Sequence, residues 1–158
     1  MNTRKRLRLP AYDYSQNGTY FVTICTENRR RCLSDVGRGG VLPRPAGIAA
    51  EREILALTDR FDVHIDKYVI MPNHVHLLIT LQRAGQSPAP TAGLSAIIGA
   101  FKSLSTKAIN QLDNTPGRKL WQRSYYDHAI RNDADYLRTW QYIHDNPARW
   151  AEDEYYSE

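Results

Sequence analysis

The sequence predicts an α+β fold of the ferredoxin-like sandwich class, an antiparallel sheet with helices packed on one face. Three observations support this class. The chain has 158 residues, enough for one domain with its own hydrophobic core. Strand-like and helix-like patterns occur in the order strand, possible short strand, helix, hairpin, helix, helix. Helices stacked on an antiparallel sheet satisfy that order, and the ferredoxin-like arrangement is the commonest such solution.

The strands are expected at residues 19–26 and in a hairpin over residues 62–81. Residues 19–26 are rich in β-branched and aromatic side chains and follow the turn signal Gly18. Residues 62–70 alternate polar and apolar types, as in a half-buried strand. Pro72 and Asn73 interrupt the pattern, because proline cannot donate to a ladder and asparagine favours turns. Residues 74–81 then form the second arm of the hairpin.

Helices are expected over residues 48–57, from a cap at Thr91 to about residue 112, and over residues 133–146. Pro147 ends the last one, because the residue before a proline is disfavoured in helical geometry. Residues 37–47, the flexible linker 82–90 and the irregular segment 120–131 connect these elements. The second helix carries one apolar stripe, made of Leu94, Ile97, Ile98, Phe101, Leu104, Ala108 and Leu112.

The composition excludes a membrane protein and a disulfide scaffold. No apolar run approaches the roughly 18 residues that span a bilayer, and the basic N-terminus lacks the apolar stretch of a secretion signal. Only Cys25 and Cys32 are present, which favours a reducing cytoplasm, although one disulfide between them stays open. We therefore expect a single cytoplasmic domain over residues 1–158, with no membrane partner.

The net charge of +4 is unevenly distributed. A basic segment covers residues 1–18, and the tail from residue 151 is acidic. A basic cluster attracts nucleic acid through its phosphates, but it also serves as an ordinary soluble surface, so both interpretations stay open. The basic residues of the first 31 positions are Arg4, Lys5, Arg6, Arg8, Arg29, Arg30 and Arg31.

Two histidines in the pattern His74-Val75-His76 are candidate metal ligands. Residues two apart on a strand project to the same face, with about 7 Å between their Cα atoms. Both imidazoles can therefore reach one cation, while Val75 points into the core. A pair of histidines on a solvent-facing strand needs no metal, so the pattern alone also fits a structural role.

Tyr142 and Asn146 form the second candidate site. At a spacing of four residues on the last helix they share one face, about 6 Å apart. Tyr142 can act as the nucleophile of a covalent mechanism, and Asn146 can supply an oxygen ligand. In the structural alternative, Tyr142 packs in a helix interface and Asn146 caps the helix before Pro147.

The chain resembles single-tyrosine transposases, and more narrowly the REP-associated tyrosine transposases. The main likeness is residues 68–79, YVIMPNHVHLLI, which resemble the histidine–hydrophobic–histidine segment of that family. It continues in residues 20–26, 101–103, 127–131 and 142–147, in the family's order and over nearly the whole chain. The resemblance implies a ferredoxin-like catalytic domain of a bacterial protein associated with DNA.

By the same resemblance the enzyme acts on hairpin-forming single-stranded DNA with Mg²⁺ or Mn²⁺, as a monomer or a homodimer. His74 and His76 become metal ligands and Tyr142 the nucleophile that forms a 5′-phosphotyrosine. Asn146 stands where relatives carry a third ligand, often a glutamine, so the resemblance implies that Asn146 is a further metal ligand and differs from those relatives in residue type. On chemistry alone, two imidazoles and an amide oxygen also suit zinc.

Further residues are candidates for DNA contact or proton transfer. The basic N-terminal residues and Lys102 are expected to contact the DNA backbone, with His128 and Arg131 as further DNA-binding candidates. His128 and Asp127 are possible general bases. Trp121 is either a base-stacking residue or a core aromatic, with the core favoured.

Two rival classes and an inactive form compete with the nuclease. The first is a non-catalytic single-stranded nucleic-acid-binding module of the same fold, although the Lys/Arg-Gly-Phe-type aromatic strand of such modules is missing. The second is a zinc hydrolase, for which the sequence has no His-Glu-x-x-His helix. An inactive, degenerate transposase is a further alternative, but the sequence keeps all four key residues, His74, His76, Tyr142 and Asn146.

Overall fold

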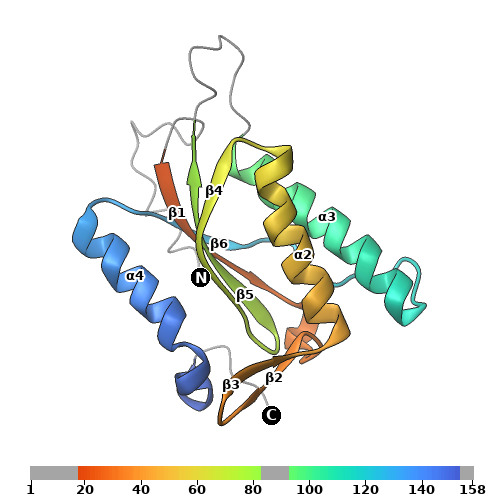
Figure 1. Cartoon of the computed structure of the whole chain (residues 1–158). Coiled ribbons are helices and arrows are strands. Elements are labelled where there is room, and N and C mark those ends of the chain that lie inside the picture. The colour runs from red at the N-terminus through yellow and green to blue at the C-terminus, as the bar shows by residue number, and fades with distance from the viewer. Residues whose placement is uncertain (1–17, 83–92, 154–158) are drawn as a thin grey trace.

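The computed structural model describes residues 18–82 and 93–153. Its main sheet has four strands in the order β4-β5-β1-β6, with every neighbouring pair antiparallel (Figure 1). The strands are β1 (Gly18–Cys25), β4 (Val63–Ile70), β5 (His74–Leu81) and β6 (Tyr126–Ala129). With one helix after β1 and another after β5, this is the ferredoxin-like arrangement, and the predicted fold class is confirmed.

The strand β6 corrects the expectation of an irregular segment over residues 120–131. It is only four residues long and lies at the edge of the sheet, where it pairs Tyr126 with Thr23 and His128 with Phe21. A strand this short carries too few residues for an alternating pattern to be detected. It completes the sheet beside the central strand β1.

A second small sheet stands where the sequence indicated a loop. Strands β2 (Ser34–Gly37) and β3 (Gly40–Pro43) pair as a hairpin whose turn places Gly40 at φ 110°. The helix α2 (Pro45–Arg60) then begins at once, with proline in its first turn, earlier than the expected residue 48. Gly47 is required there, because a Cβ would collide with the Leu33 carbonyl oxygen.

The helices α2 and α3 (Leu94–Asp113) lie together on one face of the sheet and form the core with it (Figure 1). The helix α3 begins after Gly93, not at the expected cap Thr91, which lies outside the described residues. The predicted stripe is displaced, because Ser105 and Ile109 are buried while Leu112 is 57% exposed. The central core residues from β1, β5, α2 and α3 include Tyr20, Val22, Ile24, Leu77, Ile79, Ile54, Ile97, Ile98 and Phe101.

The last helix, α4 (Asp133–Asp145), lies on the opposite face of the sheet from α2 and α3 (Figure 1). It packs against β4 and β5, so the expectation that all helices share one face holds only for α2 and α3. As a result β5 is covered on both sides, and His74, Leu78 and Val75 are all fully buried. Short 3-10 turns at Glu27–Arg29 (η1) and Pro147–Glu152 (η2) complete the described elements.

No helix among the described residues is long and apolar enough to cross a membrane. The basic residues Arg4, Lys5, Arg6 and Arg8 and most of the expected linker 82–90 lie outside the described residues.

Candidate active site

His74 and His76 project from β5 toward the face that carries α4, with their Nε2 atoms 3.1 Å apart. They are 0% and 1% exposed, which corrects the expectation of a solvent-facing pair. The cover comes from α4 and the segment that follows it, neither of which can be placed over β5 from local sequence. Both imidazoles nevertheless face one point, as their spacing on the strand predicts.

Each imidazole is held by a hydrogen bond at its other nitrogen. Nδ1 of His74 lies 2.8 Å from the Asn73 amide oxygen, which can only accept, so this Nδ1 carries the proton. Nδ1 of His76 lies 2.8 Å from the hydroxyl of Thr23, the cross-strand neighbour on β1. A hydrogen bond to the ring nitrogen that does not bind the metal orients a metal-ligating histidine and fixes its tautomer.

The Thr23 hydroxyl allows His76 to change tautomer. Without a cation, one of the two facing Nε2 atoms must carry a hydrogen; His76 then donates to His74 and accepts from Thr23 at Nδ1. With a cation, both Nε2 lone pairs are needed, so Nδ1 of His76 must donate. A hydroxyl both donates and accepts, so Thr23 satisfies either form.

Both imidazoles are kept neutral. Burial lowers the pKa of His74 to about 3; the nearby Asn146 side chain opposes the shift and the charge of Arg29 adds to it. The pKa of His76 is also well below its ordinary value, first because of burial and then because of His74. Neutral imidazoles keep a lone pair, which is the form that binds a metal ion.

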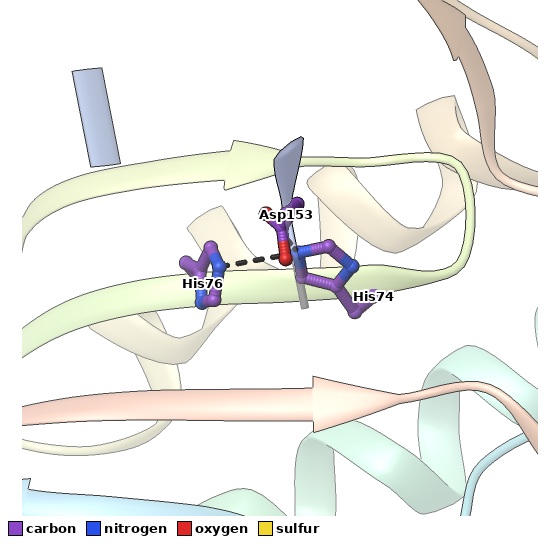
Figure 2. A group of neighbouring side chains, drawn as sticks. All are labelled: His74, His76 and Asp153. Atoms are coloured by element: carbon purple, nitrogen blue, oxygen red, sulfur yellow. Dashed lines mark hydrogen bonds and ion pairs between the residues drawn. The ribbon is translucent and has the colours of Figure 1, made fainter. Parts of the chain in front are cut away.

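Oxygen donors lie beside the two rings. The Asp153 carboxylate approaches to 3.9 Å from Nε2 of His74, and its side chain is only 2% exposed. The ligand atoms of His74, His76 and Asp153 all lie within 4.8 Å of one another. Figure 2 shows the three side chains next to one another. Asp153 follows η2, and sequence reasoning missed it because it stands among the tail acids with no motif around it.

Asn146 is buried at the end of α4, where it is the C-terminal cap residue. Its Oδ1 atom has no well-formed hydrogen bond within residues 18–82 and 93–153, although the side chain is close enough to His74 to affect its pKa. A buried amide oxygen without such a bond is costly by about 1–3 kcal/mol, and a cation would satisfy it. The expectation that Asn146 approaches the histidines is therefore supported by proximity.

The donor set fits a divalent cation. Ligand atoms about 2.1 Å from one ion and at right angles to each other stand about 3 Å apart, which matches the spacing of the two Nε2 atoms. A carboxylate and an amide oxygen add hard ligands of the kind that Mg²⁺ and Mn²⁺ prefer. Two neutral imidazoles also suit zinc, so the donors alone do not select one metal.

Tyr142 lies on α4 next to this cluster, in the same chain. Its ring centroid is 5.4 Å from that of His76 and 5.9 Å from that of Phe21, and the residue is 43% exposed. Contacts at the other end of α4 set this position: the Asn132 side chain caps the helix, and the Tyr136 hydroxyl donates to Asp66 on β4 at 2.6 Å. Tyr136 is thus a structural residue of the helix.

A cleft of about 490 Å³ opens beside Tyr142. It lies between α4 and the strands β1, β5 and β6, and both Tyr142 and His76 line it. The residues that line it are Phe21, Thr23, His76, Tyr126, Arg138, Thr139 and Tyr142.

The structure distributes the other candidate residues away from this cleft. The Lys102 ammonium donates to the carbonyl oxygens of Gln122 and Arg123 at 2.6 and 2.9 Å, which ties α3 to the segment before β6. Trp121 is buried in the core and donates to Ser105, as the favoured alternative predicted.

His128 and Arg131 are joined through Asp135 in the first turn of α4. His128 Nε2 lies 2.9 Å from the Asp135 carboxylate, which also accepts from the Arg131 amide. Neither His128 nor the buried Asp127 lines the cleft, so a proton-transfer role for either stays a prediction.

Comparisons with known proteins relate the chain to transposases. Residues 14–146 match the family described as "Transposase IS200 like". A REP-associated tyrosine transposase of Escherichia coli K12 is 29% identical over 137 residues, 86% of this chain and 70% of its own length. An uncharacterized protein of Haemophilus influenzae is 31% identical over 169 residues, 97% of this chain and 93% of its own length.

A solved structure shares the fold. The REP-associated tyrosine transposase bound to a REP hairpin matches with a TM-score of 0.65 at 22% identity, covering 90% of this chain and 73% of that one. Its likeness supports the ferredoxin-like arrangement of sheet and helices described above.

Proposed function

The chain belongs to the IS200-like transposase family, and from this premise we propose that it cleaves and rejoins hairpin-forming single-stranded DNA through a 5′-phosphotyrosine intermediate. One observation carries the proposal. Tyr142, which is 43% exposed, lies beside the buried, neutral imidazoles of His74 and His76 in the same chain. Tyr142 and His76 line the same cleft. That is the arrangement that a metal-assisted nucleophile requires.

The proposed substrate is a DNA hairpin with a single-stranded flank. The E. coli relative is described as REP-associated, and a protein of the same fold has been solved on a REP hairpin. The cleft next to Tyr142 is lined by aromatic rings and a guanidinium, which suits unpaired bases and phosphate more than the outside of a duplex.

His74, His76 and Asp153 would hold Mg²⁺ or Mn²⁺, with Asn146 as a further oxygen donor. When bound, the ion supplies charge that stabilises the oxygens of the scissile phosphate during displacement. The protein keeps both imidazoles neutral by burial and orients them through Asn73 and Thr23.

In the cleavage step the Tyr142 oxygen forms a bond to phosphorus and the bond from phosphorus to the 3′ oxygen breaks. The 3′ oxygen leaves with the electron pair and takes up a proton, and the 5′ phosphate remains on the tyrosine. An ordinary tyrosine is ionised in only about one molecule in a thousand at pH 7, so its proton must pass to a base or to water during the attack. Tyr142 is 43% exposed and lines an open cleft, so water reaches its side chain.

Rejoining reverses these bond changes. A 3′ hydroxyl attacks the phosphotyrosine, a phosphodiester forms, and Tyr142 recovers its proton. The number of phosphoester bonds is unchanged in each direction, so no external energy source is needed. Because all the groups named come from one chain, the proposal does not require a partner subunit.

The test is trapping of a covalent adduct. Labelled single-stranded DNA with a hairpin and an unpaired flank is incubated with the protein and Mn²⁺, then run on a denaturing gel. We expect a DNA-linked protein band that disappears with EDTA and in the variant His76→Ala. An adduct of the same yield in EDTA would refute the metal role, and the absence of any adduct with REP-type or insertion-end hairpins would refute the proposal.

A further inference from the structure

The cleft beside Tyr142 extends past the catalytic groups over the sheet face of β1 and β6. The helix α4 packs against β4 and β5, and the cleft lies where this cover ends. On β1, Phe21 and Thr23 line it, and Tyr126 lines it from the edge strand β6. Phe21 and Tyr126 are both partly exposed, so their rings are accessible from the cleft.

Three aromatic rings meet in this part of the cleft. The centroid of Phe21 is 6.0 Å from that of Tyr126 at 70° and 5.9 Å from that of Tyr142 at 87°. Both are edge contacts, so Phe21 is not stacked face to face on either tyrosine. A volume of about 490 Å³ falls within the range of roughly 300–1,000 Å³ that encloses a small ligand.

A cation stands at the same cleft. Arg138 precedes Tyr142 by one helical turn, so the two side chains share a face of α4. Its side chain is 73% exposed and its ion pair with Asp135 is 3.5 Å long. An exposed pair of this kind contributes at most about 1 kcal/mol, so the guanidinium can exchange it for a phosphate.

We propose that Phe21, Tyr126 and Arg138 form a nucleotide subsite that takes one unpaired nucleotide adjacent to the scissile phosphate. The base stacks on the ring of Phe21, the ring of Tyr126 contacts its edge, and Arg138 pairs with a backbone phosphate. This inference rests on the proposed function, because Tyr142 borders the subsite and sets which phosphodiester is attacked.

The chemistry of the cleft favours a nucleotide over other occupants. Stacking on aromatic side chains is tolerant of sequence, because every base has a π face, and it contributes about 1–3 kcal/mol per base. The guanidinium supplies the positive charge that a phosphate requires, and the remaining lining groups, Thr23, His76 and Thr139, are neutral. A base held here places its own phosphate within the space that Tyr142 shares.

The experiment measures stacking directly. The probe is a short single-stranded oligodeoxynucleotide whose central base is 2-aminopurine, a base that loses fluorescence when it stacks. Binding is titrated in EDTA with the Tyr142→Phe protein, so that no cleavage or covalent capture occurs. We expect the fluorescence to be quenched on binding. Phe21→Leu should reduce the affinity roughly 5- to 150-fold and weaken the quenching, and Phe21→Trp should restore both the affinity and the quenching.

Arg138 is tested through salt dependence. Arg138→Gln should lower the slope of log affinity against log salt by about 0.7, the value for one phosphate contact on a single strand, and Arg138→Lys should keep it. Arg52→Gln is the matched control, because Arg52 is an exposed arginine on α2, on the far side of the sheet. Its slope should equal that of the parent.

The results separate this subsite from the proposed function. If the parent protein fails to bind or quench the probe, or if Phe21→Leu binds and quenches as the parent does, the subsite is refuted even where wild-type protein forms the DNA adduct. Quenching that depends on Phe21, in a protein that forms no adduct with Mn²⁺, would keep the subsite and refute the cleavage proposal.

Discussion

Removing the Thr23 hydroxyl should weaken metal binding without removing any metal ligand. Thr23→Val keeps the shape of the side chain and deletes only the oxygen that lies 2.8 Å from Nδ1 of His76. In the cation-bound form that Nδ1 must carry a proton, and in the variant the N–H group is buried without its partner. The free protein is less affected, because His76 can still donate to His74 through Nε2.

The magnitude follows from the burial of this contact. His76 is 1% exposed, so water cannot replace the hydroxyl, and an unsatisfied buried donor costs about 1–3 kcal/mol. Loss of an outer partner of a ligating histidine commonly weakens metal binding by about 10- to 100-fold. Both arguments predict that the dissociation constant for Mn²⁺ rises by at least about tenfold in Thr23→Val.

Calorimetric titration with Mn²⁺ measures this effect, and Thr19→Val is the matched control. Thr19 lies on the same strand and face, and its hydroxyl bonds to Thr80 at 2.8 Å, away from the histidines. Its Mn²⁺ affinity should equal that of the wild type. Equal affinity of Thr23→Val and wild type would refute the orienting role of Thr23, and an equal loss in both variants would mean a general effect on β1.

Three further predictions concern other parts of the structure. Asp153→Asn should weaken Mn²⁺ binding by at least roughly tenfold and Asn146→Ala by less, because only the carboxylate carries charge; calorimetry giving the reverse order would contradict this assignment. Gly47→Ala should destabilise the fold by about 1–3 kcal/mol in urea, because its Cβ meets the Leu33 carbonyl, whereas Gly99→Ala, with open space, should stabilise it by about 0.5–1 kcal/mol. In EDTA, the unfolded protein protonates His74 below its ordinary pKa of 6.5, whereas the folded protein protonates it only near pH 3. The free energy of unfolding in urea should therefore be at its full value above pH 6.5 and fall by up to about 1.4 kcal/mol per pH unit below it. A constant free energy of unfolding from pH 7 to 5 would contradict the burial of His74.

Much of the fold follows from local sequence patterns. The hairpin of β4 and β5 and the helix α4 were predicted nearly to the residue, because alternation and the breaks at Pro72 and Pro147 are local signals. The strand β6 was missed because four residues at a sheet edge carry no detectable period. The β2–β3 hairpin was missed because its glycines and prolines resemble a loop.

The site was only partly predictable, because only some of its contacts follow from local sequence patterns. The shared face of His74 and His76 follows from the strand period, and the shared face of Tyr142 and Asn146 from the helix period. The burial of both histidines depends on α4 crossing the sheet, which is a tertiary contact without a local signal. Asp153 enters the site through the path of the chain after η2, so no spacing rule could identify it.

The contact between α4 and β4 also changes the choice of control for the Tyr142→Phe variant. Tyr136 lies on the same helix, and on sequence alone it serves as a neutral comparison. In the structure its hydroxyl donates to Asp66 and helps to fix the helix on β4, so Tyr136→Phe can shift Tyr142. Tyr68→Phe is the better control, because the Tyr68 hydroxyl donates to Glu51 on α2, on the face of the sheet opposite Tyr142.

The most direct test of the account is to locate the DNA on the protein. The adduct trapped with Mn²⁺ is digested with nuclease and trypsin and analysed by mass spectrometry. The tryptic peptide of residues 139–149 contains Tyr142 as its only tyrosine, and Tyr136 and Tyr126 fall in other peptides. We predict the phosphonucleotide on that peptide, loss of the adduct in Tyr142→Phe with Mn²⁺ binding retained, and an adduct in Tyr68→Phe. An adduct on another peptide, or one that survives Tyr142→Phe, would contradict the central claim.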